Sequence, residues 1–151
     1  NVGNNSVAMG FGTRASGSTS IALGSNCVAL GLGSVAIGWS TNANATQSTA
    51  FGLATNANSL YSTAFGYSTT TSGDASVAIG VNNETKSFGE TALGIGATLY
   101  TPSTNGSNQF RTANANDRLL VVGNAIDANS NDIVDSAERS DALVILKNGN
   151  T

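Results

Sequence analysis

Side chains that could bind a metal ion gather in one acidic segment near the end of the sequence, residues 127–138. Oxygen-bearing side chains occupy positions 1, 3, 5, 9 and 12 of this segment and an apolar residue occupies position 8, the spacing found in loops that hold Ca²⁺. Position 6 is Asp132, where such loops use a glycine for a sharp turn. Two interpretations remain open, a calcium site and a solvated acidic surface loop. The candidate calcium ligands are Asp127, Asn129, Asn131, Asp135 and Glu138.

Residues that could perform catalysis are scarce. The sequence has no histidine, which removes the commonest general base and the commonest zinc ligand, and Cys27 is its single cysteine. Because no histidine can activate it, Cys27 is a poor candidate for a nucleophile. It stands in a column of small residues that recurs along the chain, so we interpret it as a buried filler. We expect that the protein is not an enzyme, and that calcium is the one possible cofactor.

The charge balance argues against a nucleic-acid partner. Lysine and arginine together number 6, against 9 aspartates and glutamates, and the formal net charge is −3. Nucleic-acid binding needs a basic surface that displaces counterions. The sequence also lacks an apolar run of membrane-spanning length, so we expect no membrane insertion of this segment.

A four-residue signature, one β-branched residue followed by alanine, a bulky apolar residue and glycine, organises the first two thirds of the chain. It recurs every 14 residues without an insertion. A small residue also recurs halfway between the signatures, at Ala15, Ala29, Ala43, Ala57, Thr71 and Thr85. Each repeat therefore predicts two short extended segments joined by turns. The signatures occupy residues 7–10, 21–24, 35–38, 49–52, 63–66, 77–80 and 91–94.

These repeats predict strands and not helices. Each glycine inside a helix would cost about 1 kcal/mol, and the pattern has no period of 3.6 residues. A fixed period with parallel stacking is typical of a β-solenoid, in which each coil forms hydrogen bonds with the next at a spacing of about 4.8 Å. We expect an all-β rod with 14-residue coils.

The alternation of side chains along a strand assigns the two faces of each sheet. The small residues, Ser, Thr, Ala and Gly, recur in both half-coils and predict a thin interior. The bulky side is polar in one half-coil and apolar in the other, and a soluble monomer does not expose an apolar stripe of that size. We expect this stripe to bury itself between copies of the chain, with packing against the chain's own C-terminal segment as the alternative. The residues expected at this interface between copies are Val7, Met9, Ile21, Leu23, Val35, Ile37, Phe51, Phe65, Val77, Ile79 and Leu93.

The sequence Ser-Val-Ala-Ile-Gly, which stands at residues 34–38 and 76–80, resembles the head repeat of YadA-type trimeric autotransporter adhesins. The resemblance covers residues 1–96. It implies a left-handed parallel β-roll, three chains around a common axis, and a location outside the cell on the bacterial surface. It also implies a structural and adhesive role, with a surface receptor or the extracellular matrix as the partner.

The 14-residue pattern stops after residue 96, and residues 97–151 are expected to form a small C-terminal β-rich cap or connector. Residues 100–108 are expected to be a loop. The apolar runs at 119–122 and 142–146 are rich in β-branched residues, and we expect them to pair and close the last coil. This segment resembles modules that follow head repeats in large surface proteins and tail-fibre-like proteins.

Three functions are open at this point. The first is a head fragment of a trimeric bacterial surface adhesin that binds host or environmental surfaces. The second is a phage tail-fibre or receptor-binding module, which would place the protein on a phage tail. The third is an ice-binding β-solenoid, which would need a uniform ladder of threonines on one exposed sheet. The sequence does not show such a ladder.

Overall fold

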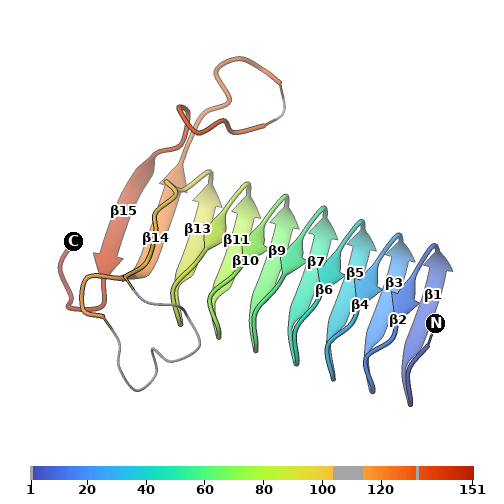
Figure 1. The fold of residues 1–151 in the computed structure, drawn as a ribbon. Helices are drawn as coiled ribbons and strands as arrows, with labels where there is room; N and C mark the ends of the chain where they lie inside the picture. The colour runs from blue at the N-terminus through green and yellow to red at the C-terminus, as the bar shows by residue number, and fades with distance from the viewer. Residues whose placement is uncertain (1, 104–113, 132) are drawn as a thin grey trace.

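The chain forms a parallel β-solenoid that is closed at one end by a β-hairpin (Figure 1). The structure is a computed structural model, and it describes residues 2–103, 114–131 and 133–151. These residues contain no helix. The all-β solenoid predicted from the 14-residue period is confirmed.

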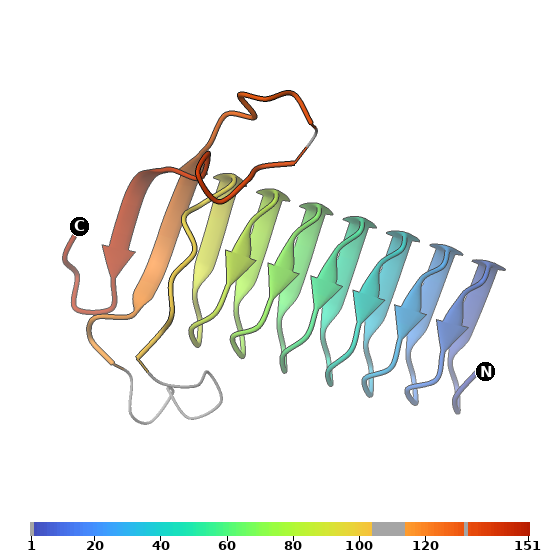
Figure 2. The ribbon, with the colours of Figure 1, turned by 45° about the horizontal axis from the view of Figure 1, so that its top comes forward.

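Each of the first six coils contributes one long strand and one short strand, the seventh contributes a long strand alone, and the two kinds of strand form two stacked sheets (Figure 2). The long strands carry the four-residue apolar signature, and the short strands carry the small residue that recurs halfway between two signatures. The long strands are β1 (Val7–Phe11), β3 (Ile21–Ser25), β5 (Val35–Trp39), β7 (Thr49–Leu53), β9 (Thr63–Tyr67), β11 (Val77–Val81) and β13 (Thr91–Ile95). The short strands are β2 (Arg14–Ala15), β4 (Val28–Ala29), β6 (Asn42–Ala43), β8 (Asn56–Ala57), β10 (Thr70–Thr71) and β12 (Glu84–Thr85).

The register between coils follows the sequence period without a shift. Val35 pairs with Thr49, Ile37 with Phe51, and the same 14-residue step relates the other rungs of the roll. Because identical columns stack, each side chain meets its counterpart from the next coil. This stacking is why one column can be read as interior and the next as surface.

The interior consists of small side chains, as the alternation predicts. Ala36, Ala50 and Ala64 on the long strands and Ala43 and Ala57 on the short strands have no exposed surface. The serine that precedes the signature is buried in most coils, and in several of them its hydroxyl donates to a carbonyl three residues earlier, as Ser62 does to Ser59 at 2.7 Å. The two sheets therefore approach closely, and small side chains fill most of the space between them.

The glycine of the signature is required by the backbone. Gly52 has φ of 129°, and a Cβ atom at this position would lie 2.0 Å from the carbonyl oxygen of Gly66 in the next coil. The same contact recurs along the column, so no other residue can stack in this way. The turns add a second backbone requirement, since residues such as Ala54 and Tyr61 have φ near 56° and 59°.

The C-terminal segment extends the long sheet. Strand β14 (Arg118–Asn124) pairs in parallel with β13 and aligns Val121 with Ala92 and Gly123 with Gly94. Strand β15 (Asp141–Leu146) pairs with β14 in antiparallel orientation, which is the pairing expected between residues 119–122 and 142–146. The long sheet therefore continues past residue 96 and has nine strands. The loop expected at residues 100–108 falls partly outside the described residues.

Candidate assembly surface

The apolar residues of the long sheet lie on its outer face. Phe65 is 47% exposed and Met9 is 66% exposed, although both side chains are large and apolar. Other members of the stripe, including Val35 and Ile37, are partly exposed. The strands place these side chains opposite the buried alanines, as the period of two residues requires. All eleven residues expected at a trimer interface therefore belong to one continuous face of the single chain.

The side chains on this face stack regularly along the roll. The rings of Phe51 and Phe65 are parallel within 5°, and their centroids lie 5.1 Å apart. Each phenylalanine stands two residues after a threonine, Thr49 or Thr63, whereas Ile37 and Ile79 each stand two residues after a valine. Large and small side chains thus alternate between neighbouring columns. The surface they form is ordered and comparatively smooth, which suits close packing against a partner.

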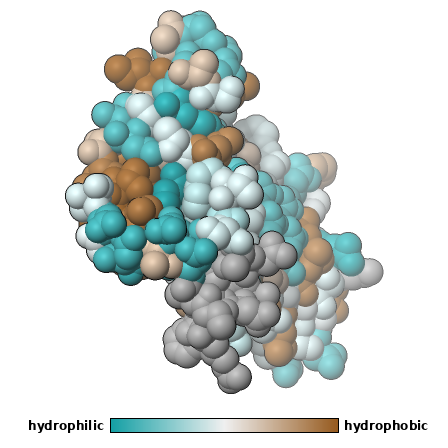
Figure 3. Space-filling view, turned by 60° about the vertical axis from the view of Figure 1, so that its left-hand side comes forward, coloured by the Kyte–Doolittle hydropathy of each residue, from teal (hydrophilic) through white to brown (hydrophobic). Residues whose placement is uncertain are grey.

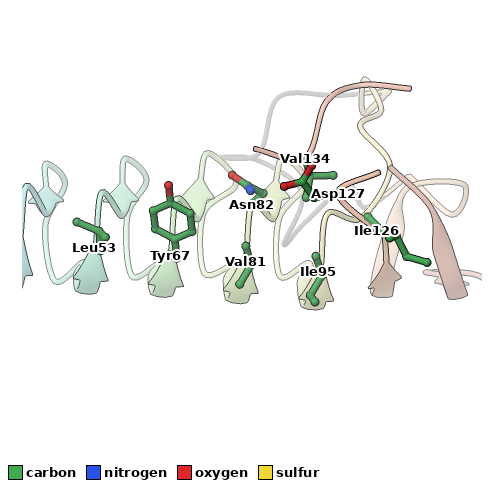
Figure 4. Close-up of a pocket in the computed structure, with 9 residues that line it drawn as sticks. Leu53, Tyr67, Val81, Asn82, Ile95, Ile126, Asp127 and Val134 are labelled. Atoms are coloured by element: carbon green, nitrogen blue, oxygen red, sulfur yellow. The ribbon is translucent and has the colours of Figure 1, made fainter. Parts of the chain in front are cut away.

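The described residues of the chain's own C-terminal segment do not cover this face. Strands β14 and β15 continue the sheet sideways, as Figure 1 shows, and do not fold over it. The alternative in which the C-terminal segment buries the stripe is therefore wrong. Among the described C-terminal residues, only the loop after β14 approaches, and it reaches the edge of the face at the ends of the last long strands. There it closes a groove of about 660 Å³ with Leu53, Tyr67, Val81 and Ile95 (Figure 4).

The short sheet presents a polar outer face. Asn42 donates a side-chain hydrogen bond to Asn56 at 2.8 Å, and Asn44 donates one to Asn58 at 2.7 Å. These ladders run along the roll and leave polar atoms toward water. Leu30, which is 39% exposed, interrupts the polar character near the first coils. The polar and apolar sheets thus divide the roll into a solvent side and a side that is suited to assembly.

The end of the molecule formed by the cap has a mixed surface. Figure 3, which views this end, shows brown apolar patches separated by teal polar ones. Leu119 and Leu143, on β14 and β15, are 45% and 39% exposed. The continuous apolar stripe is therefore a property of the roll and not of the whole surface.

A buried ion pair joins the last coil to the cap, and the sequence analysis did not identify it. Glu90 stands in the serine column and has no exposed surface, while Arg118 on β14 is 4% exposed. Their charged groups lie 2.9 Å apart, a charge contact without the alignment of a hydrogen bond. The signal that could have revealed it is the appearance of a carboxylate where six earlier repeats carry serine.

Glu90 also replaces hydrogen bonds that a further coil would supply. In the regular coils the N–H of a short strand donates to the carbonyl of the next one, as Ser72 does to Thr85 at 2.8 Å. Strand β12 is the last of the six-stranded sheet. Beyond it, Oε2 of Glu90 accepts the N–H groups of Lys86 and Ser87 at 2.8 and 3.0 Å. One carboxylate thus satisfies backbone donors at the end of the roll.

Other ionisable groups of the cap are partly buried against the last coils. The guanidinium of Arg118 lies 4.0 Å from the ring centroid of Tyr100 and donates to the carbonyl of Thr98 at 2.7 Å. Burial raises the pKa of the Tyr100 phenol, the hydrogen bond with Ser87 opposes this rise, and the Glu90 carboxylate adds to it. Burial also lowers the pKa of Arg139, whose Nη1 donates to the carbonyl of Ala97 at 2.9 Å. These contacts attach the cap to the last coil.

The candidate calcium ligands lie in the loop between β14 and β15, where they bond mainly to one another. Glu138 accepts the backbone N–H groups of Ala128, Asn129 and Asp135, at 2.9, 3.2 and 2.9 Å. The side-chain amides of Asn129 and Asn131 both donate to the carboxylate of Asp135, at 2.8 and 3.3 Å. In the described part of the chain, no three acidic, cysteine or histidine side chains converge as metal ligands would. Asp132 lies outside the described residues, and the calcium site stays a prediction.

Cys27 occupies the interior, as a filler would. It has no exposed surface, and its thiol contacts the carbonyl oxygens of Leu23 and Gly38 at 3.2 and 3.0 Å. Asn83 stands in the same column and donates to the corresponding carbonyls of Ile79 and Gly94, both at 2.8 Å. The column therefore provides polar contacts between coils, and Cys27 is not placed for reaction with solvent molecules.

Comparison with known proteins agrees with this architecture. A family model described as the YadA head domain repeat matches residues 2–26, 29–55 and 57–83, which is more than half of the 151 residues. No curated protein and no solved structure matches the chain. The match ends before β13, so the likeness of residues 97–151 to modules of other surface proteins stays a prediction. No helix in the described residues could span a membrane. The repeats, their register and the family match together place this chain in the YadA head domain repeat family.

Proposed function

We propose that this chain is the head fragment of a homotrimeric bacterial surface adhesin, in which three long sheets face a common axis. The observation that carries the proposal is the uncovered apolar face of the long sheet. Heads of the YadA type are homotrimeric, structural and adhesive, and membership of their family supports the same role here. The family also supports a bacterial surface location and gives no support to the phage-tail alternative.

Energetics favour assembly through this face. Burying ten of its apolar side chains would contribute on the order of 15 kcal/mol, at about 1.5 kcal/mol each. Globular proteins of this size are stable by only about 5–15 kcal/mol, and an interior of alanine, serine and glycine buries little apolar surface per residue. The folded roll is therefore stabilised substantially by its partners, and its stability should depend on protein concentration.

The adhesive surface is expected on the solvent side of the trimer. The polar sheet with its asparagine ladders would face outward on all three protomers. Three identical faces, repeated over many molecules on a cell, can hold a surface through individually weak contacts. The partner would be a surface receptor or the extracellular matrix. This arrangement needs no catalytic group and none is proposed.

The test is the solution mass of this chain by multi-angle light scattering across a range of concentrations. The proposal predicts a mass near three times 15.1 kDa. It also predicts that the melting temperature rises with concentration, because trimer formation is linked to folding. A folded monomer at high concentration, with its apolar face still open to solvent, would contradict the proposal.

A further inference from the structure

The groove at the edge of the apolar face is built from two parts of the chain. Leu53, Tyr67, Val81 and Ile95 end four successive long strands and form a row along one wall, as Figure 4 shows. Ile126 and Val134 come from the loop after β14 and stand beside the row. Leu53 and Ile95 remain 40% and 43% exposed. The loop thus adds a raised apolar wall to a sheet edge that would otherwise be flat.

The opposite edge of the same sheet carries apolar residues that the single chain leaves exposed. Leu60 and Tyr61 form the turn that leads into β9, and they are 40% and 59% exposed. Tyr61 holds this position in a left-handed conformation, with φ of 59°. The corresponding turn one coil earlier has polar residues, Thr46 and Gln47. The packing of one chain gives no reason for a leucine and a tyrosine at this turn.

Three-fold symmetry brings these two edges together. A cyclic trimer uses a heterologous interface, in which one surface of each copy meets a different surface of the next copy. When three sheets face a common axis, the side of one sheet on which its long strands end adjoins the side of the next sheet on which its long strands begin. Rotation about an axis parallel to the roll leaves every coil at its own height. The turn before β9 therefore meets the groove at the level of β9, where Tyr67 lies in the middle of the row.

We propose that the groove receives the turn at Leu60 and Tyr61 of the neighbouring copy. The inference rests on the proposed trimer and goes further by naming the two surfaces that join. Both surfaces are mainly apolar and exposed in the single chain, although Asn82 and Asp127 also line the groove. They lie on opposite edges of the assembly face and stand at the same height. The groove continues the face that the trimer buries, and each groove is completed only by a residue of another copy.

Disulfide trapping tests this contact directly. In a Cys27→Thr background, Tyr61→Cys is combined with Tyr67→Cys, and the protein is oxidised mildly and run on a denaturing gel. The two positions lie at opposite ends of β9, about 20 Å apart at roughly 3.3 Å per residue, so one chain cannot bridge itself. The proposal predicts a covalent trimer that reducing agent converts to monomer.

A matched pair controls for random collision. Thr19 occupies the same left-handed turn position three coils earlier, with φ of 57°. It therefore lies about 14 Å away along the roll, at about 4.8 Å per coil. Thr19→Cys with Tyr67→Cys should give no covalent trimer. If both pairs cross-link equally, or if neither does while the protein is trimeric by light scattering, this contact is wrong and the proposed function stands. A monomeric wild-type chain would overturn both.

A second variant measures the contribution of the turn. Leu60→Thr with Tyr61→Gln copies the turn of the preceding coil, Thr46 and Gln47, so the fold of the coil is preserved. It should weaken trimer formation at least tenfold, as measured by the concentration at which the light-scattering mass falls by half. Leu30→Thr is the control, since Leu30 is 39% exposed on the outer face of the polar sheet, away from the assembly face. Equal effects of both variants would contradict the proposed contact.

Discussion

The carboxylate of Glu90 lies 2.9 Å from the guanidinium of Arg118, and both side chains are almost completely buried. The pair joins the last coil of the roll to the first strand of the cap, 28 residues later in the sequence. The same carboxylate accepts two backbone N–H groups at the end of the short sheet. A single residue therefore both closes the edge of one sheet and holds the extension of the other.

Replacing Glu90 should be costly. Glu90→Ala removes the nearer of the two carboxylates beside the buried Arg118 charge, leaving only Asp141 at 4.0 Å, and it removes the acceptor of two backbone donors. Breaking one side of a buried pair costs about 3–5 kcal/mol. Urea unfolding at fixed protein concentration measures the loss, and hydrogen exchange should accelerate at the amides of Lys86 and Ser87. Ser62→Ala, in the same column, removes two neutral hydrogen bonds, one donated to Ser59 and one accepted from Thr71, and should cost about 2 kcal/mol. Similar costs for the two variants would argue against this role of Glu90.

The glycine column should tolerate no side chain. In Gly52→Ala, the new Cβ would lie 2.0 Å from the carbonyl oxygen of Gly66, so the two coils must separate. We expect a loss of at least about 2 kcal/mol in the free energy of unfolding. Gly89→Ala is the control, because Gly89 has φ of 65° with nothing within 4 Å. Its cost should be limited to the left-handed backbone, about 1 kcal/mol. The comparison fails if Gly89→Ala proves the more damaging change.

One turn substitution should stabilise the roll. Ala54 has φ of 56°, a conformation that costs an ordinary residue about 1–2 kcal/mol and that glycine adopts freely. Ala54→Gly should therefore raise the free energy of unfolding by up to about 1 kcal/mol, after the greater flexibility of glycine in the unfolded chain is subtracted. Thermal unfolding measures the change. Ala50→Gly, at a buried strand position, should instead destabilise the protein. A decrease in stability for both variants would contradict the interpretation of the turn.

Charges placed on the apolar face should prevent assembly. Ile37→Asp with Ile79→Asp would bring six carboxylates close to the axis of a trimer, and unpaired charges are costly to bury. Light scattering should then give the mass of a monomer. Asn42→Asp with Asn56→Asp adds the same number of charges to the polar sheet and should leave assembly intact. A double mutant at Ile37 and Ile79 that stays fully trimeric would mean that the two sheets have been assigned to the wrong sides.

The calcium hypothesis has its own test. If the loop between β14 and β15 binds Ca²⁺, millimolar Ca²⁺ should raise the melting temperature of the protein in calorimetry, and Asp127→Ala with Glu138→Ala should remove the increase. Magnesium at the same concentration serves as the control, because the smaller Mg²⁺ ion requires a nearly octahedral set of ligands. An unchanged melting temperature would favour the alternative of a solvated acidic loop, in which Glu138 serves to cap backbone donors.

The roll could be predicted from the sequence because its determinants are local and repeated. The period of 14 residues sets the coil, and the alternation of side chains separates the Ala50 side of a strand from the Phe51 side. Residues at equivalent positions of successive coils stack on one another, so the register between coils follows from the period alone. The same alternation predicts the polar face of the short sheet and the interior position of Cys27.

The tertiary structure decided how the roll ends. Whether β14 would continue the long sheet or fold over its apolar face depends on the path of the connection after β13, which has no repeat to guide it. Glu90 and Arg118 are far apart in sequence, and neither predicts the other. The groove beside Tyr67 exists because the loop after β14 returns to the edge of the sheet. Local periodicity thus determined the coils, whereas contacts between distant residues determined the cap, since those contacts depend on the folded path of the chain.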